Sequence, residues 1–215
     1  MHMKRKEKEF FIIMQRLITL ALSSVVLLSL TAAAQENRSE FSLQGTGFFT
    51  RSTSGNGTQY SATENAGFLT TYRYHLNHWA SVEGAYGYDL NTQKYLITAE
   101  AFRLQSSIHQ LTGSLVINAP TRGHSRLNPY LLAGAGALIF APSGNQFNSL
   151  AGAQTQTKGA FVYGLGVNYA IHKNVSLRAE YRGLVYGTPD FGFGALTTNS
   201  VTHTAEPSIG ISFRF

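Results

Sequence analysis

The stretch that decides the fold is Pro207-Ser208-Ile209-Gly210-Ile211-Ser212-Phe213-Arg214-Phe215, at the end of the sequence. Side chains along an extended strand point alternately to its two faces. One face of this strand is therefore apolar, and the other is small or polar apart from a single arginine. The apolar face carries Ile209, Ile211, Phe213 and Phe215, and the opposite face carries Ser208, Gly210, Ser212 and Arg214. The pattern predicts a strand with one face in an apolar environment.

The same alternation recurs upstream, and no sustained helical period of apolar residues follows Gln35. Turn-forming residues separate the alternating segments, and short connections alternate with long ones. The short connections are 77–78, 118–128 and 172–174, and the long ones lie near 50–65, 89–101, 141–157 and 187–200. The expected strands are 38–49, 66–76, 79–88, 102–117, 129–140, 158–171, 175–186 and 201–215. This order predicts an all-β, eight-stranded antiparallel up-and-down barrel.

The composition narrows the class of protein. Of 215 residues, 13% are charged and 12% are aromatic, which excludes a disordered chain. The mean hydropathy of −0.08 is too low for a bundle of membrane helices, but it fits a transmembrane barrel, in which only alternate residues face lipid. Because the chain has no cysteine, disulfide frameworks, thiolate metal sites and cysteine nucleophiles are excluded.

Residues 1–34 predict a helical signal peptide. A basic region precedes an apolar run of about fourteen residues, which is shorter than the roughly 20 needed to span a bilayer as a helix. A small-residue site follows, so cleavage between Ala34 and Gln35 would leave one barrel domain at 35–215. The sequence leaves the start codon open among Met1, Met3 and Met14.

The net charge of +6 depends largely on this leader. Residues 1–34 hold five of the 17 basic and two of the 11 acidic residues, so 35–215 carries 12 against 9, a charge of +3. No cluster of lysine and arginine remains in 35–215. We therefore expect no nucleic-acid partner.

Charge placement predicts which face of the barrel is polar. In the expected strands, charged residues share a face with glycine and serine, while tyrosine, phenylalanine and aliphatic residues occupy the other. The charged residues on the polar face are Arg73, Glu83, Arg178, Glu180, Arg182, Glu206 and Arg214. With the leader, this arrangement favours a transmembrane barrel with a polar interior. A soluble lipocalin-like binder is the alternative, and it would place the aromatic face inside.

The interior charges are nearly balanced. Eight strands leave an interior just wide enough for side chains to fill it, and buried charges must be paired or solvated. We therefore expect the seven charged residues to form an interior ion-pair network that fixes strand register and plugs the barrel. The alternative is a gated ion path that opens when the pairs rearrange.

Patterns for catalysis and metal binding are weak. Histidines of the mature region such as His75, His109, His124, His172 and His203 lie far apart in the sequence, and a metal-ligand spacing such as H-x-x-x-H is absent. His109 or His203 beside a serine is the arrangement that would suit a lipid-modifying enzyme. Asp190-Phe191-Gly192 spells a kinase magnesium tripeptide without the other kinase motifs. We therefore expect no catalytic residues, no metal and no cofactor.

Four stretches together resemble the small outer-membrane β-barrel family of Gram-negative bacteria, similar to the OmpA barrel and OmpX. They are Tyr72-Arg73-Tyr74-His75, Pro129-Tyr130-Leu131-Leu132-Ala133-Gly134-Ala135-Gly136, Val175-Ser176-Leu177-Arg178-Ala179-Glu180-Tyr181-Arg182 and Phe213-Arg214-Phe215. The resemblance covers 35–215 and implies a location in the bacterial outer membrane after export. It also implies that the barrel-assembly machinery reads a C-terminal signal made by Ile209, Ile211, Phe213 and Phe215.

The resemblance and the residues lead to one favoured function. We expect a non-enzymatic, membrane-structural protein whose four loops, rich in Gly, Ser, Asn, Gln and Thr, serve surface contact or adhesion. A narrow gated ion or small-solute channel is the alternative, and a lipid-modifying enzyme ranks below it. The expected partners are outer-membrane lipid and lipopolysaccharide, with the assembly machinery and periplasmic chaperones during biogenesis. We expect a monomer.

Overall fold

The computed structural model describes residues 38–56, 58–97, 100–120, 125–142, 153–193 and 198–215. Over these ranges its regular secondary structure is β-strand. Within them, no helix has the length and apolar character needed to cross a membrane. The signal peptide expected at 1–34, with cleavage between Ala34 and Gln35, falls outside the described residues. All the strands belong to one compact unit, Ser39–Arg214.

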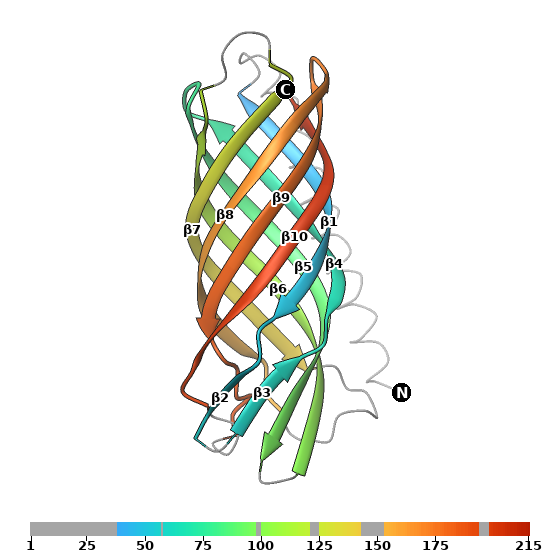
Figure 1. Cartoon of the computed structure of the whole chain (residues 1–215), viewed down its shortest axis with the longest axis vertical. Coiled ribbons are helices and arrows are strands. Elements are labelled where there is room, and N and C mark those ends of the chain that lie inside the picture. The colour runs from blue at the N-terminus through green and yellow to red at the C-terminus, as the bar shows by residue number, and fades with distance from the viewer. Residues whose placement is uncertain (1–37, 57, 98–99, 121–124, 143–152, 194–197) are drawn as a thin grey trace, which may run out of the picture. The chain divides into compact units, whose positions relative to one another are not determined.

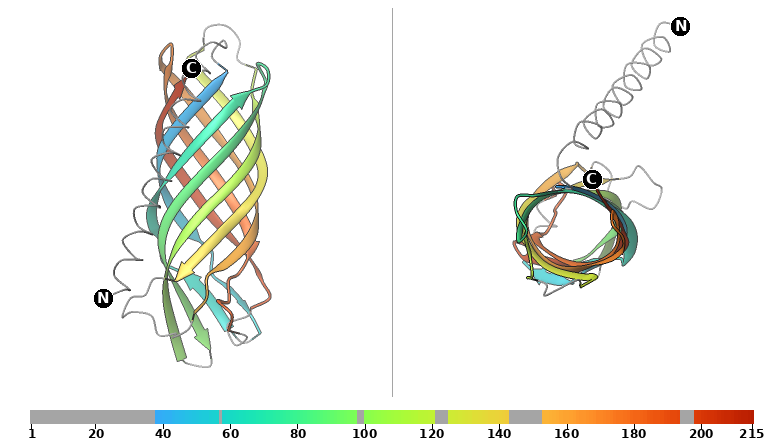
Figure 2. Two further views of the ribbon diagram at one scale, coloured as in Figure 1. Left: turned by 180° about the vertical axis from the view of Figure 1, so that it is seen from behind. Right: turned by 90° about the horizontal axis from the view of Figure 1, so that it is seen from above.

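Eight long strands of this unit form a closed ring, which is seen along its axis in Figure 2. Each strand is antiparallel to its neighbours, and β10 pairs with β1 to close the ring, with Phe41 opposite Phe213. In order around the ring (Figure 1), the strands are β1 (Ser39–Thr50), β4 (Asn65–His75), β5 (Ala80–Ile97), β6 (Glu100–Asn118), β7 (Leu127–Pro142), β8 (Gln156–His172), β9 (Val175–Gly187) and β10 (Val201–Arg214). The predicted eight-stranded antiparallel barrel is confirmed.

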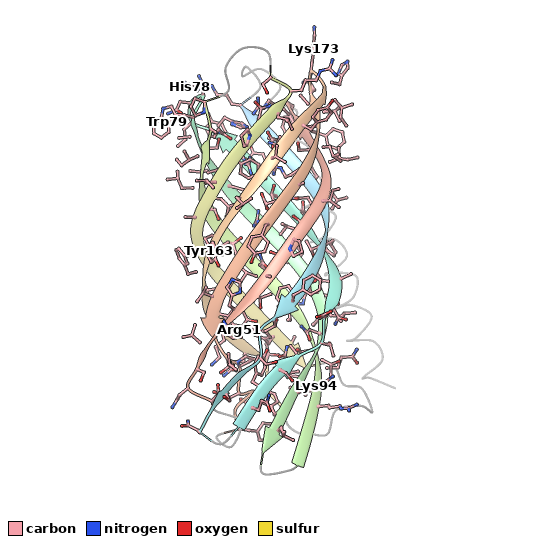
Figure 3. All side chains as sticks on the ribbon, viewed as in Figure 1. Arg51, His78, Trp79, Lys94, Tyr163 and Lys173 are labelled. Atoms are coloured by element: carbon pink, nitrogen blue, oxygen red, sulfur yellow. The ribbon has the colours of Figure 1, made fainter. Side chains whose placement is uncertain are left out.

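The barrel has two different ends. Short connections such as β4–β5 and β8–β9 lie at one of them, which we call the turn end and which carries His78, Trp79 and Lys173 (Figure 3). The opposite, loop end carries the long connections β1–β4, β7–β8 and β9–β10, and Arg51 and Lys94 lie toward it (Figure 3). This separation agrees with the predicted alternation of short and long connections except at β5–β6, where only residues 98–99 separate the two strands.

Two of the expected long loops are partly strand. The segment near 50–65 contains β2 (Thr53–Gly55) and β3 (Thr58–Ala62), and β3 pairs with the far part of β5. The prediction of a loop at 89–101 is wrong, because β5 continues to Ile97 and pairs with β6 from Glu100 onward. The alternation persists through this stretch, with Leu90 and Leu96 outward, but the inward residues are Asp89, Asn91 and Gln93. Inward polar residues gave the stretch the composition of a solvated loop.

The outward face is apolar and the inward face is polar. Leu131 and Ile209 are about 60% exposed, at 62% and 60%, and most other large apolar residues of the ring are exposed outward as well. By contrast, Arg73, Arg178 and Arg182 have no exposed surface. A soluble barrel would have the reverse arrangement, so the lipocalin-like alternative is wrong. Hydrocarbon suits the outward face, because a closed barrel leaves no backbone edge unpaired in lipid.

Candidate functional site in the barrel interior

Three buried arginines dominate the interior near the turn end. Arg73 lies on β4, and Arg178 and Arg182 lie four residues apart on β9, on the same face of that strand. Each is completely buried inside the barrel. An ionised guanidinium without a partner is costly to bury, so the position of its counter-charges decides whether the interior is stable.

Glu83 binds all three arginines. It lies directly opposite Arg73 in the β4–β5 ladder, and Arg73 Nε and Nη2 contact Glu83 Oε2 at 2.9 and 2.7 Å. Arg182 Nη2 donates to Glu83 Oε1 at 2.7 Å from the opposite wall, and Arg178 Nη1 contacts Glu83 Oε2 at 3.4 Å. One carboxylate therefore ties β5 to strands on two sides of the ring.

Glu180 and Tyr130 complete the centre of this arrangement. Arg182 Nε contacts Glu180 Oε1 at 2.5 Å, and Arg73 Nη2 lies 3.7 Å from Glu180 Oε2. Tyr130 donates its hydroxyl to Glu180 Oε2 at 2.5 Å, and the Arg73 guanidinium lies 4.2 Å from the centre of the Tyr130 ring. This distance is short enough for a cation–π interaction.

Glycine makes room for Tyr130. Gly166 lies opposite Tyr130 in the β7–β8 ladder, and a Cβ at Gly166 would lie 2.4 Å from the Tyr130 hydroxyl. Any other residue at this position would displace the phenol. The glycine on β8 is thus part of the arrangement that aims Tyr130 at Glu180.

Glu40 extends the set of ion pairs toward the turn end. It pairs with Arg178 Nη2, and it lies 3.3 Å from His75 Nε2 and 3.4 Å from Arg214 Nη2. Arg214 also lies 2.8 Å from the same nitrogen of His75, and its side chain is 45% exposed. We use the term ion-pair network for Glu40, Arg73, Glu83, Arg178, Glu180 and Arg182.

The structure thus places five of the seven charged residues singled out from the sequence in the network, and Arg214 lies at its edge. Glu206 stands apart: it accepts a hydrogen bond from Gln110 Nε2 at 3.2 Å and forms no ion pair within the described ranges. Sequence reasoning missed Glu40 and Tyr130. Glu40 faces inward beside Arg73 in the register, and this position on the polar face was the signal that could have found it.

An aromatic layer closes the interior at the loop end. Phe140 packs edge-on against Phe191 with ring centres 6.3 Å apart, and Tyr60 lies 5.4 Å from Tyr95. Phe191, from the β9–β10 connection, is fully buried although its φ of 52° is uncommon for a bulky residue. We call the following residues the aromatic cap: Phe48, Tyr60, Tyr95, Phe140, Tyr186 and Phe191.

The connection that carries Phe191 is held at the barrel mouth by polar contacts. Tyr95 donates its hydroxyl to the Pro189 carbonyl at 2.7 Å, and Gln156 Nε2 donates to Asp190 Oδ1 at 2.7 Å. Lys158 Nζ lies 3.8 Å from Asp190 Oδ2. Asp190 therefore attaches the connection to β8, which gives the Asp-Phe-Gly tripeptide a structural role.

The histidines do not assemble a site in the described ranges. His109 Nδ1 and His203 Nε2 each lie 2.9 Å from a tyrosine hydroxyl, those of Tyr86 and Tyr163. Both pairs lie on the outward surface of the ring, and these contacts are with tyrosine rather than with serine. His124 lies outside the described residues. In the described part of the chain, no three His, Asp or Glu residues converge as metal ligands.

Comparisons with known proteins agree with this architecture. The outer membrane protein beta-barrel domain family matches residues 20–215. OprG from Pseudomonas aeruginosa is 15% identical with a TM-score of 0.57, and covers 84% of this chain and 97% of its own. Neisserial surface protein A is 20% identical with a TM-score of 0.53, over 81% and 97% of the two chains.

A further solved structure, outer membrane protein AlkL in lipid bilayers, is 14% identical with a TM-score of 0.53 and covers 84% of this chain and 91% of its own. At these identities the solved structures show the fold alone. No curated protein sequence matches the chain. Because the family match spans nearly the whole sequence, the chain belongs to the outer membrane protein beta-barrel domain family and is a protein of the bacterial outer membrane.

Proposed function

We propose that this protein is a closed, non-enzymatic barrel of the outer membrane, which supports the membrane and presents its loop end for surface contact. The observation that carries this proposal is the complete burial of Arg73, Arg178 and Arg182 across the interior. Their side chains and carboxylate partners occupy the space that ions or solutes would need. The aromatic cap adds a second barrier at the loop end.

The outward surface supports a lipid environment on all sides. At the turn end, Trp79 is 49% exposed, and Tyr72, Tyr169 and Phe213 face outward on the parts of β4, β8 and β10 near that end. Aromatic residues at this level are typical of the girdles that meet lipid headgroups. With the turn end on the periplasmic side, the loop end would face the outer leaflet. Lipopolysaccharide is then its lipid partner, and we propose that the barrel acts as a monomer.

We propose the same route of biogenesis that the sequence suggests. The signal peptide at 1–34 would direct export, and the periplasmic chaperones and assembly machinery would recognise the last strand. The outward positions of Ile209, Ile211 and Phe213 on β10 support recognition of an apolar face, and Phe215 follows it. N-terminal sequencing of the membrane-inserted protein tests this route, because cleavage after Ala34 gives a chain that begins with Gln35.

Single-channel recording in a planar bilayer tests the closed-barrel proposal. Residues 35–215 are refolded, heat-modifiable gel migration confirms the folded barrel, and insertion is verified before current is measured. The expected result is an inserted barrel without steady openings. Steady openings would refute the proposal.

A narrow gated channel is the second candidate. It is favoured by the polar stretch of the interior between the ion-pair network and the aromatic cap, where Ser106 Oγ, Asn91 Nδ2 and Gln93 Nε2 have no hydrogen-bond partner among the described residues. Such atoms are satisfied by water. Openings whose size changes in the Glu83→Ala variant would establish this candidate over the closed barrel.

A further inference from the structure

A charge imbalance remains in the interior after the ion pairs are counted. The buried charged side chains of the described ranges are three arginines and five carboxylates. Glu40, Glu83 and Glu180 pair with these arginines. The remaining two, Asp89 and Glu206, join no ion pair within the described residues. Two buried carboxylates without a salt bridge require a compensating positive charge.

The nearby cations do not supply this charge. Arg182 attracts Glu206, but Glu83 and Glu180 already bind it through its Nη2 and Nε atoms. Arg214 lies eight residues from Glu206 along β10, about 26 Å at a rise of about 3.3 Å per residue, and it pairs with Glu40. The positive charge must therefore come from outside the chain.

Four residues from four strands converge around the two carboxylates: Thr46 on β1, Asp89 on β5, Gln110 on β6 and Glu206 on β10. All four are at least nine-tenths buried. Gln110 Nε2 bonds Glu206 Oε2 at 3.2 Å across the barrel. Asp89 is close enough to Glu206 to interact with it electrostatically, and Thr46 and Asp89 flank Gly67, which lies opposite each of them in its ladder. We call these four residues the acidic layer.

Within the described ranges, three carboxylate and amide oxygens of the acidic layer lack a donor, and the hydroxyl oxygen of Thr46 has no hydrogen-bond partner either. Asp89 Oδ1, Glu206 Oε1 and Gln110 Oε1 have no hydrogen-bond partner among the described residues, although each is buried. Ionised carboxylate and amide oxygens only accept hydrogen bonds, so these three atoms cannot satisfy one another, and the Thr46 hydroxyl has a single hydrogen to donate among them. A buried acceptor without a partner costs about 1–3 kcal/mol, and more when it is charged.

The backbone leaves space for one of these oxygens. A Cβ at Gly67, which lies opposite Asp89 in the β4–β5 ladder, would lie 2.0 Å from Asp89 Oδ1. The absence of a side chain at Gly67 thus lets the Asp89 carboxylate lie against β4 and face the interior.

We propose that one divalent cation of the Ca²⁺ and Mg²⁺ class binds in the acidic layer. The carboxylates of Asp89 and Glu206 neutralise its two charges, and the amide oxygen of Gln110 and the hydroxyl of Thr46 add neutral ligands. Hard oxygen ligands of this kind suit Ca²⁺, whose remaining ligands would be water. The cation would join β1, β5, β6 and β10 across the interior. This site goes beyond the proposed function and does not depend on whether the barrel conducts.

The position of the layer sets how a cation enters. Along β5, Asp89 is six residues from Glu83 in the ion-pair network and six from Tyr95 in the aromatic cap, about 20 Å along the strand in each direction. Both ends of the layer are therefore covered by packed side chains. Loading is expected during folding and exchange afterward is expected to be slow.

The test is metal binding by the refolded chain 35–215 in detergent. The protein is refolded with Ca²⁺, with Mg²⁺ or with a chelator, passed through a desalting column, and its metal content is measured by mass spectrometry. The isosteric variants Asp89→Asn and Glu206→Gln are treated in parallel. Glu64→Gln, which changes an exposed acid outside the interior, is the matched control. Heat-modifiable migration shows in every sample that the barrel has folded.

The expected result is about one Ca²⁺ per folded wild-type and control barrel, and affinity weaker by about tenfold or more in each layer variant. A higher unfolding midpoint after refolding with Ca²⁺ than with chelator is expected for the wild type and not for the Asp89→Asn/Glu206→Gln double variant. A folded wild type without metal after refolding in millimolar Ca²⁺ or Mg²⁺ would overturn the proposal, since protons would then neutralise the carboxylates. Equal metal content in the folded double variant would also overturn it.

Discussion

Substitution of Glu83 by glutamine is the sharpest test of the ion-pair network. The change preserves the shape of the side chain and removes a carboxylate that three buried arginines share, at 2.7 Å from Arg73, 2.7 Å from Arg182 and 3.4 Å from Arg178. Two of these arginines retain Glu180, and Arg178 retains Glu40. The network would then hold three guanidiniums with only two carboxylates.

The magnitude follows from that imbalance. Removal of one partner from a buried ion pair costs about 3–5 kcal/mol, because a charge is left uncompensated in a poorly solvated interior. Because the amide oxygen of glutamine still accepts hydrogen bonds, we expect Glu83→Gln to lower the free energy of unfolding by an amount near the lower end of this range. At a denaturant dependence of about 2–3 kcal/mol per molar urea, the unfolding midpoint would fall by about 1–2 M.

The assay uses the single tryptophan of the chain. Trp79 lies at the turn end and is half exposed on the outward face, so its fluorescence reports transfer between lipid and water. Reversible urea unfolding from lipid vesicles gives the free energy of unfolding for wild type, Glu83→Gln and the exposed control Glu64→Gln. The control should lie within about 0.5 kcal/mol of wild type. If Glu83→Gln also lies within this range, the network does not stabilise the barrel and the reasoning fails.

Three further predictions use the same unfolding assay. Gly166→Ala should destabilise the barrel strongly, because its Cβ would lie 2.4 Å from the Tyr130 hydroxyl. Gly45→Ala has open space around it and should be neutral or slightly stabilising. Equal effects of the two substitutions would contradict this reasoning. Tyr130→Phe should cost about 1–3 kcal/mol through the lost hydrogen bond to a carboxylate while it keeps the ring under the arginine, and no loss would show that the bond is unimportant. Burial raises the pKa of Tyr60 and Tyr95 in the loop-end extension of the sheet. Their stabilisation should therefore be complete below about pH 10 and fall above it, by about 1.4 kcal/mol per pH unit for each tyrosine, and a Tyr60→Phe/Tyr95→Phe variant should show a flatter profile.

The fold followed from the sequence because a barrel wall repeats one simple rule. Each strand alternates outward apolar residues with inward polar or small ones, and this alternation is visible residue by residue without any contact being known. The prediction failed between 89 and 101, where the inward residues are polar and the outward face carries Thr92 and Lys94 between Leu90 and Leu96. Because polar residues stand on both faces of this stretch, the contrast that marks a strand weakens.

The partners inside the barrel could not be predicted in the same way. Alternation places Arg182 and Glu83 on inward faces, but it does not predict that they contact each other across the lumen. That contact depends on ring closure and on the tilt of the strands. Tyr130 was missed because an inward tyrosine carries no charge. Its hydroxyl nevertheless binds the carboxylate of Glu180, and its ring lies against the guanidinium of Arg73. Gly166 reveals its role only once Tyr130 is known to lie over it.

The inward residues of β5 show that each layer of the interior compensates its buried side chains in a different way. Glu83, Asp89 and Tyr95 face inward on β5 at six-residue intervals, and they belong to the ion-pair network, the acidic layer and the aromatic cap. The charges of the ion-pair network neutralise one another, and the aromatic cap contains no charged residue. Only the middle layer has both unpaired carboxylates and oxygens without donors. Because packed layers lie on both sides of it, a charge placed there cannot be screened by bulk water, which is why this layer, and not the larger network beside it, requires an ion or proton from outside the chain.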